Sequence, residues 1–92
     1  DCVVVAIGVE ANTDWLRDTA IARDERGAIL VDERMRTSAP DVFAAGDCAA
    51  VPFIDGTKRP ELLWYTGRDQ GRVAARVMLG ESATYVRGPW YN

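Results

Sequence analysis

Short apolar runs, each ended by glycine or by polar residues, divide the 92-residue chain. Residues 2–7 (CVVVAI) are largely β-branched and stop at a glycine, so we expect a buried strand there. Residues 21–24 and 28–32 flank a charged turn that contains Gly27, which predicts a hairpin because glycine readily adopts a positive φ. Charged residues predominate in residues 33–36, and we expect these at the exposed surface.

Two helices are predicted from capping residues and from periodicity. The first is short and covers residues 13–18. Asn12 or Thr13 would cap it, and Asp14 would lie in its first turn, where a negative charge is favourable. The second covers residues 60–80 and ends at a glycine suited to a carboxyl-terminal cap. Residues spaced three and four apart should form its buried face. These are Leu63, Gly67, Gln70, Gly71, Ala74, Val77 and Met78.

Two positions on that face are glycines, Gly67 and Gly71. Each lowers helix stability by roughly 1 kcal/mol relative to alanine, so we expect a closely packed neighbour to be the reason for them. On the other side of the helix, Asp69 and Arg72 are three residues apart, and we expect a weak ion pair on a solvated surface.

The most informative stretch is residues 42–47 (VFAAGD), where an apolar run gives way to small residues and then to a carboxylate. Its first two residues suit a strand that is covered on both faces. Ala45 and Gly46 have almost no side chain, so a bulky ligand has room to approach the backbone. Asp47 would then lie just outside the carboxyl end of a strand, where open α/β sheets bind their ligands and where a carboxylate accepts hydrogen bonds. A Gly-Asp pair alone would favour a simple strand and turn.

A longer match changes that interpretation. Residues 37–47 (TSAPDVFAAGD) resemble, over eleven consecutive positions, the second flavin-binding motif of the FAD-dependent pyridine nucleotide–disulfide oxidoreductases. In that family the aspartate hydrogen-bonds the ribityl chain of FAD, and nearby backbone N–H groups approach the pyrophosphate. The resemblance therefore implies cofactor contacts by Gly46, Asp47 and Cys48. Thr37 is expected to hydrogen-bond within its own loop.

The second helix carries a further resemblance. Residues 63–71 (LWYTGRDQG) are similar to the Trp-x-x-Ala-x-x-Gln-Gly helix of ferredoxin-reductase-like and NADH-oxidase-like members, with Gly67 where those often have alanine. In these groups the amino-terminal end of the helix lies near the flavin pyrimidine ring, which implies cofactor contacts by Leu63, Trp64 and Tyr65. A helix amino terminus suits that place because it carries unpaired N–H groups and a partial positive charge.

The two ends of the chain also resemble this family. Residues 3–16 (VVVAIGVEANTDWL) look like the return from the NAD(P)H domain to the FAD domain, although Ala11 stands where proline is frequent. Residues 85–92 (YVRGPWYN) resemble the start of the carboxyl-terminal interface domain. The resemblance thus implies an α/β fold, a partial Rossmann-like FAD-binding domain that is incomplete without an upstream chain. Its parts would be the end of the NAD(P)H-binding domain (1–11), the second half of the FAD-binding domain (12–80) and the start of the interface domain (81–92).

Composition narrows the chemistry further. The net charge of −3 gives no electrostatic reason to expect binding to nucleic acid or to an anionic membrane, and no apolar run approaches the length of a membrane span. Histidine is absent, which excludes His-based triads and Cys/His zinc sites, and we expect no metal. Cys2 and Cys48 are expected to be reduced thiols in a cytoplasmic protein. Cys48 is not expected to be catalytic, because neither His nor Lys lies nearby to activate it.

The function implied by the resemblance is that of a flavoprotein oxidoreductase with FAD and NAD(P)H as cofactors. A hydride would pass from the nicotinamide to the flavin, and electrons would continue to an unknown acceptor. The partners would be the remainder of the parent chain, that acceptor and, because uncovered sheet edges tend to pair, further copies in a homo-oligomer. The resemblance assigns no catalytic residue to these 92 residues, so the chain alone should be inactive.

Three alternatives stay open. One is a thioredoxin-reductase-like disulfide reductase, which the helix containing Trp64 disfavours, since that group usually has Arg-Gln-Ala there. Another is a flavin hydroxylase, whose matching motif usually includes a histidine that this chain lacks. The third belongs to a different class, a non-catalytic folding or dimerisation module.

Overall fold

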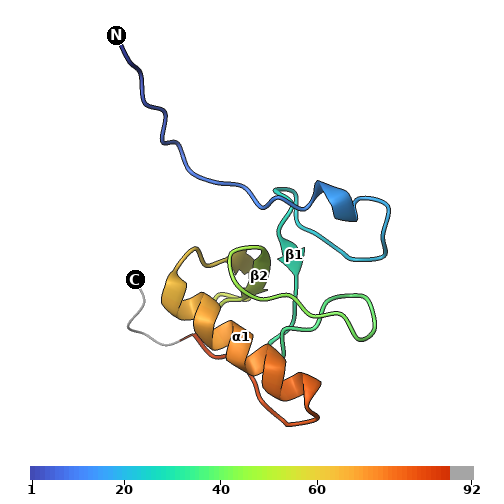
Figure 1. Cartoon of the computed structure of the whole chain (residues 1–92). Coiled ribbons are helices and arrows are strands. Elements are labelled where there is room, and N and C mark those ends of the chain that lie inside the picture. Colours follow the sequence, from blue (N-terminus) through green and yellow to red (C-terminus); the bar gives the residue numbers. More distant parts are fainter. Residues whose placement is uncertain (88–92) are drawn as a thin grey trace.

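The computed structural model of the chain describes residues 1–87. Its elements in chain order are the short 3-10 helix η1 (Asp14–Leu16), the strands β1 (Ile29–Leu30), β2 (Ala49–Pro52) and β3 (Lys58–Pro60), and the long helix α1 (Trp64–Met78). The strands form one sheet in the order β1-β2-β3, in which β2 is parallel to β1 and antiparallel to β3. Figure 1 shows α1 beside this small sheet. The predicted α/β class is confirmed, in the form of a partial domain.

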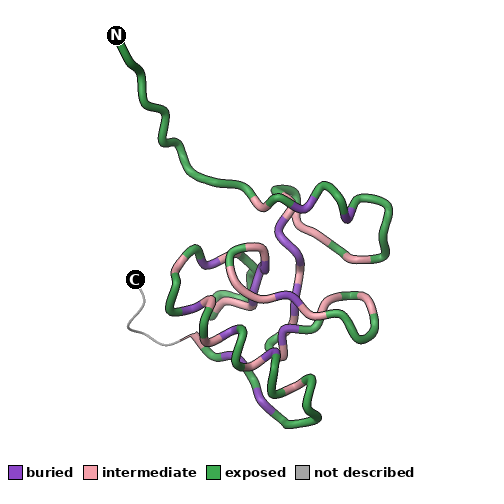
Figure 2. The backbone as a smooth tube through the Cα atoms, viewed as in Figure 1, coloured by how far each residue is buried: buried purple, intermediate pink, exposed green. Residues whose placement is uncertain are grey.

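The hydrophobic core joins α1 to the sheet and to the loops that flank it (Figure 2). Its buried members are Leu16, Ile29, Val31, Met35, Ala44, Ala49, Val51, Ala74 and Tyr85. From α1 the buried residues are Thr66, Gln70 and Ala74, which are four residues apart and therefore share one face. The predicted helix face was right at Gln70 and Ala74 but wrong at Gly71 and Met78, which are exposed.

The helix itself is shorter than predicted. It begins at Trp64 rather than at residue 60, because Pro60 ends strand β3 and pairs with Ala50. Its carboxyl-terminal end is as predicted: Gly80 has a φ of +87°, and its N–H donates to the carbonyl of Val77 at 2.9 Å. The predicted ion pair between Asp69 and Arg72 is present, with Nη1 3.7 Å from Oδ1.

Residues 2–7 do not form the expected buried strand. Val3, Val5 and Ile7 are 88%, 72% and 93% exposed, and the segment extends away from the rest of the molecule in Figure 1. A strand needs a neighbour for its backbone hydrogen bonds, and no other residue among 1–87 pairs with this segment. Both cysteines are free, as expected, with Cys2 exposed in this segment.

The covered strand predicted at Val42 and Phe43 is also wrong. It is reduced to an isolated bridge between Phe43 and Arg36. The buried strand is β2, which begins after Asp47 rather than before it, and its first three residues are completely buried. β2 is also the central strand, since β1 and β3 flank it on both edges. The Asp55–Gly56 turn forms as predicted but connects β2 and β3, where a plain loop was expected.

The amino-terminal hairpin and short helix are confirmed in outline. Gly27 has a φ of +89°, and Arg23 forms an antiparallel bridge with Ile29 across the turn. Asp14 lies in the first turn of η1, but the hydroxyl of Thr13 donates to the carbonyl of Gly27 instead of capping the helix. Ile29 also begins β1, which pairs with β2.

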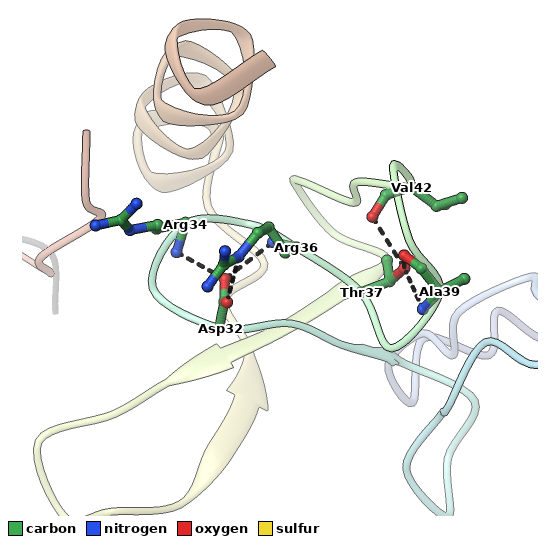
Figure 3. Close-up of polar contacts among 6 residues, drawn as sticks. All are labelled: Asp32, Arg34, Arg36, Thr37, Ala39 and Val42. Carbon is green, nitrogen blue, oxygen red and sulfur yellow. Dashed lines mark hydrogen bonds and ion pairs between the residues drawn. The ribbon is translucent and has the colours of Figure 1, made fainter. Parts of the chain in front are cut away.

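Two polar loops complete the fold (Figure 3). The carboxylate of Asp32 accepts hydrogen bonds from the backbone N–H groups of Arg34 and Arg36 and pairs with Nε of Arg36 at 2.7 Å. This turn buries Met35 completely at a φ of +62°, so residues 33–36 are not all exposed as expected. Thr37 bonds within its own loop as predicted, since its hydroxyl donates to the carbonyl of Val42 at 2.9 Å.

Candidate functional site

A tight turn presents Asp47 to solvent immediately before β2. Gly46 has a φ of +87°, a value that glycine adopts readily, and its carbonyl accepts a hydrogen bond from the N–H of Ala49 at 3.0 Å. Within residues 1–87 the carboxylate of Asp47 makes neither a hydrogen bond nor an ion pair, and the residue is exposed. Asp47 therefore precedes the amino end of β2, where the carboxyl end of a strand was expected. Its acceptor oxygens face outward and are available to a donor.

Asp47 and Leu62 line two adjoining hollows. One has a volume of about 510 Å³ and is also lined by Leu63, Trp64, Gly67 and Arg68. The other has a volume of about 300 Å³ and is also lined by Val9, Glu10, Ala11, Asn12, Arg26, Ala28, Cys48 and Pro60. A ligand that occupied both would pass directly by the carboxylate of Asp47. A third hollow of about 560 Å³, around Arg23 and Asp24, shares Glu10, Ala11 and Arg26 with the 300 Å³ hollow. It is lined mostly by charged side chains, which suits water better than a flavin ring.

The amino terminus of α1 lies at the hollow of about 510 Å³. Leu63 is the N-cap residue, with extended backbone (φ −127°, ψ 135°), and no side chain caps the helix. The nearby hydroxyl of Thr66 donates instead to the carbonyl of Leu63 at 2.9 Å. The partial positive charge of the helix end is therefore not offset by a capping side chain.

Aromatic and cationic side chains form the rim at this helix end. Trp64 and Tyr65 are 71% and 53% exposed, and their rings meet edge to face with centroids 5.5 Å apart. Arg68 lies one turn further on, with its guanidinium carbon 5.2 Å from the centre of the Trp64 ring. Of the residues predicted to contact the cofactor, Asp47, Cys48, Leu63 and Trp64 line the two hollows, whereas Gly46 and Tyr65 do not. The sequence analysis did not predict that Leu62 and Arg68 line the hollows. Arg68 could have been predicted, because it follows Trp64 by four residues and so lies on the same face of the helix.

Two contacts fasten the Gly46–Asp47 turn to α1. A Cβ atom built on Gly67 would lie 3.4 Å from Cα of Gly46, so the helix and the turn are in backbone contact. One turn later, the side-chain oxygen of Gln70 accepts the N–H of Gly46 at 2.8 Å. The packing expected at Gly67 is confirmed, but Gly71 has no neighbour within 4 Å in the direction of a Cβ.

A buried polar cluster lies just before α1 and joins it to the segment after the helix. Glu61 is 6% exposed and accepts a hydrogen bond from the hydroxyl of Tyr85 at 2.9 Å, while its second oxygen lies 2.5 Å from Nε of Arg87. Burial, together with the Glu61 carboxylate, raises the pKa of Tyr85 to about 12. This cluster was not predicted, because residues 24 and 26 positions apart meet in it and no local pattern indicates that.

Comparison with known proteins determines the family. Residues 1–71 match the family model of the pyridine nucleotide-disulphide oxidoreductases. The chain belongs to this family. Human apoptosis-inducing factor 3 is 39% identical over 92 residues, and NADH-rubredoxin oxidoreductase from Clostridium acetobutylicum is 43% identical over 84 residues. These matches cover 98% and 91% of this chain but only 15% and 20% of the two relatives.

A solved structure of the family superposes on this chain. It is an FAD-dependent pyridine nucleotide-disulphide oxidoreductase from Desulfovibrio vulgaris, 43% identical in sequence, with a TM-score of 0.78. The match covers 85% of this chain and 20% of that structure. The resemblance seen in residues 37–47 is thereby confirmed at the level of the family, whose members use FAD and NAD(P)H.

The residues around the 510 Å³ hollow fit the chemistry of FAD. An unpaired carboxylate, an uncapped helix end and a tryptophan lie around one opening, and these suit ribityl hydroxyls, an electron-rich ring edge and a ring face respectively. No group of three metal-ligating side chains occurs in residues 1–87. In the same residues, no helix combines the length and the apolar character needed to cross a membrane.

Proposed function

We propose that this chain supplies part of the FAD site of an NAD(P)H-dependent oxidoreductase. The observation that carries the proposal is that the exposed carboxylate of Asp47 shares one hollow with the uncapped amino terminus of α1. These two groups have opposite roles toward a ligand, since one accepts hydrogen bonds and the other donates them. A ribityl chain followed by a flavin ring offers both a hydroxyl donor and a carbonyl acceptor.

In this site the residues bind and orient the cofactor. Asp47 would accept a hydrogen bond from a ribityl hydroxyl, and the first N–H groups of α1, beyond Leu63, would face the pyrimidine part of the ring. Trp64 would cover one side of the ring and Cys48 would lie beside the ribityl chain, since each lines one of the two hollows. Gly46 lines neither hollow and would act by holding the backbone next to Asp47. Tyr65 supports Trp64 through their edge-to-face contact. When bound, FAD accepts a hydride from NAD(P)H and supplies electrons to a second acceptor.

The same proposal divides the chain into three parts. Residues 1–11 end an NAD(P)H-binding domain, residues 12–80 belong to the FAD-binding domain, and residues 81–92 begin an interface domain. The exposed valines and isoleucine of the first part support this division, because such a segment is stable only against other protein surface. The predicted interface motif extends into residues 88–92, which lie outside the described residues.

The acceptor and the assembly belong to the whole protein. The name of the Clostridium relative indicates that its electrons pass to rubredoxin, and we propose an electron-carrier protein as the acceptor here as well. We further propose that the whole protein is a homo-oligomer in the cytoplasm. The 92 residues alone should have no activity, because their site residues bind and orient the cofactor without taking part in hydride transfer.

The decisive experiment measures FAD affinity in the full-length protein that carries this chain. A charge-assisted hydrogen bond contributes roughly 1.5–3 kcal/mol, so Asp47→Ala should weaken FAD binding about ten- to a hundredfold. Asp47→Asn should lose less, because its amide oxygen still accepts. Asp41→Ala, an exposed residue of the preceding loop, is the matched control and should bind FAD normally. Unchanged affinity in Asp47→Ala would show that the proposed site is wrong.

A further inference from the structure

Gln70 is a polar residue that the core buries completely. It lies on the face of α1 between Gly67 and Ala74, with 0% of its surface exposed. An amide without a hydrogen bond is costly in such a place, so a buried glutamine requires an explanation in its contacts. None of the site residues that line the cofactor hollows is so deeply buried, and Gln70 itself lines neither hollow.

The contact that explains it is with the turn before β2. Oε1 of Gln70 accepts the backbone N–H of Gly46 at 2.8 Å, across 24 positions of sequence. This bond also fixes the orientation of the amide, because the reverse orientation would set its NH2 group against another donor. Gly46 lies outside the sheet, so its N–H has no strand partner. The side-chain oxygen of Gln70 takes the place of a backbone carbonyl as its acceptor.

The other end of the amide faces a second fixed group. Nε2 has no hydrogen-bond partner of standard geometry within residues 1–87, but the Gln70 side chain interacts with the hydroxyl of Tyr85. That hydroxyl donates to Glu61, and Glu61 pairs with Arg87. Gln70 therefore lies between the Gly46 turn and this buried cluster.

The bond between Gln70 and Gly46 matters because Asp47 is the next residue of the chain. The side chain of Asp47 has no partner among the described residues to hold it. Its position is set by the backbone of the turn, and that backbone is held at Gly46 by Gln70 and by the close approach of Gly67. Without the hydrogen bond from Gln70, only the approach of Gly67 would hold the turn against α1.

We propose that Gln70 is a positioning residue for the cofactor site: by accepting the N–H of Gly46 it holds the Asp47 carboxylate at a fixed place relative to the amino terminus of α1. The inference rests on the proposed function, since it assigns the site's geometry to a residue that does not touch the ligand. The competing explanation is that Gln70 only fills the core, in which case an apolar side chain of equal length would serve as well.

The test is a double-mutant cycle in the full-length protein, with FAD affinity as the readout. Gln70→Met keeps the length of the side chain but removes the acceptor, and it should weaken FAD binding about three- to tenfold, the worth of one ordinary hydrogen bond. When combined with Asp47→Ala, it should add little further loss, because the residue it positions is already gone. Fully additive losses would overturn the proposal, as would unchanged affinity in Gln70→Met alone.

A matched control separates positioning from stability. Thr66→Val alters another completely buried polar residue of α1, one turn earlier, whose hydroxyl bonds only to carbonyls of Glu61 and Leu63. It should lower the melting temperature without weakening FAD binding as Gln70→Met does. If Gln70→Met fails to fold, Gln70→Asn keeps the amide but is one methylene too short, and it should weaken FAD binding in the same way.

A second readout does not depend on the cofactor. Hydrogen exchange of the Gly46 amide, measured without FAD, should be faster in Gln70→Met than in the parent and unchanged in Thr66→Val. Unchanged exchange in Gln70→Met would overturn the inference even if FAD does not bind here at all. If Asp47→Ala binds FAD normally while Gly46 exchange still responds to residue 70, the proposed function fails and the role of Gln70 in holding the turn survives.

Discussion

Gly67 of α1 lies against the backbone of Gly46, so close that a Cβ atom added at residue 67 would be 3.4 Å from Cα of Gly46. Four residues later, Gly71 has no atom within 4 Å in the corresponding direction and is exposed. The two glycines of one helix therefore have different surroundings. Only the first is explained by close packing, and it is the one that meets the candidate site.

This difference predicts opposite effects of the same substitution. Gly67→Leu should destabilise the protein by about 1–3 kcal/mol, because its Cβ already reaches van der Waals contact with Gly46 and the rest of the side chain must displace the turn or enter the hollow. Gly71→Leu is the matched control and should be tolerated or stabilising, since leucine has the better helix propensity by about 1 kcal/mol. Chemical denaturation of both variants measures this. Equal destabilisation would mean that Gly71 also faces a packed surface.

The sequence was most informative where a motif consists of consecutive residues. Residues 37–47 predicted the family, because the whole pattern lies within eleven consecutive positions. Gly27 and Gly80 were predicted correctly for a similar reason, since a turn or a cap depends on the φ of one residue. The contacts of Gln70 with Gly46 and of Glu61 with Tyr85 were beyond reach, because each joins residues 24 positions apart.

The strands were predicted poorly for a physical reason. Residues 2–7 have high β propensity but no partner strand within residues 1–87, whereas β2 contains two alanines and a proline and is paired on both edges. Pairing, which local propensity does not encode, decided both outcomes. Met35 shows the same principle in a loop, since the charged residues around it suggested exposure and the Asp32 turn buries it.

Acid should weaken the turn that Asp32 holds. Burial raises the pKa of this carboxyl, but the hydrogen bonds from the backbone and side chain of Arg36 and from the backbone of Arg34 outweigh it and lower the pKa below 3.8. The stabilisation is therefore present above about pH 3.8 and is lost as the pH falls through the lower folded-state pKa. In Asp32→Asn, the free energy of unfolding measured by urea denaturation should depend less steeply on pH in this range than it does in the parent. An unchanged slope between about pH 5 and 2 would contradict the assignment.

Alkaline conditions should act on Tyr85 in the opposite sense. Its pKa is raised from 10.0 to about 12 because the neutral phenol is buried and donates to Glu61. The unfolded chain releases this proton first, so the stabilisation is complete below about pH 10 and is lost as the pH rises toward 12. Tyr85→Phe should remove the loss of folding stability that Tyr85 causes at alkaline pH, and it should lower the stability at neutral pH. Spectrophotometric titration at the tyrosinate band, with Tyr65→Phe as a control, identifies the tyrosine that titrates late.

The 92-residue chain alone should bind FAD weakly, with a dissociation constant above about 1 μM. Small-molecule sites usually enclose most of their ligand, and the affinity falls when polar groups are left in water. Here the Asp47 carboxylate is exposed, Trp64 is 71% exposed, and the two hollows that they line are open to solvent. Each hydrogen bond to FAD would then compete with water, and an exposed carboxylate contributes much less than a shielded one. Equilibrium dialysis of the purified chain with FAD measures the affinity, with Asp47→Ala as the control for binding at this site. Submicromolar binding that Asp47→Ala abolishes would show that these residues form a complete flavin site by themselves, and it would remove the reason for assigning the rest of the site to other parts of the protein.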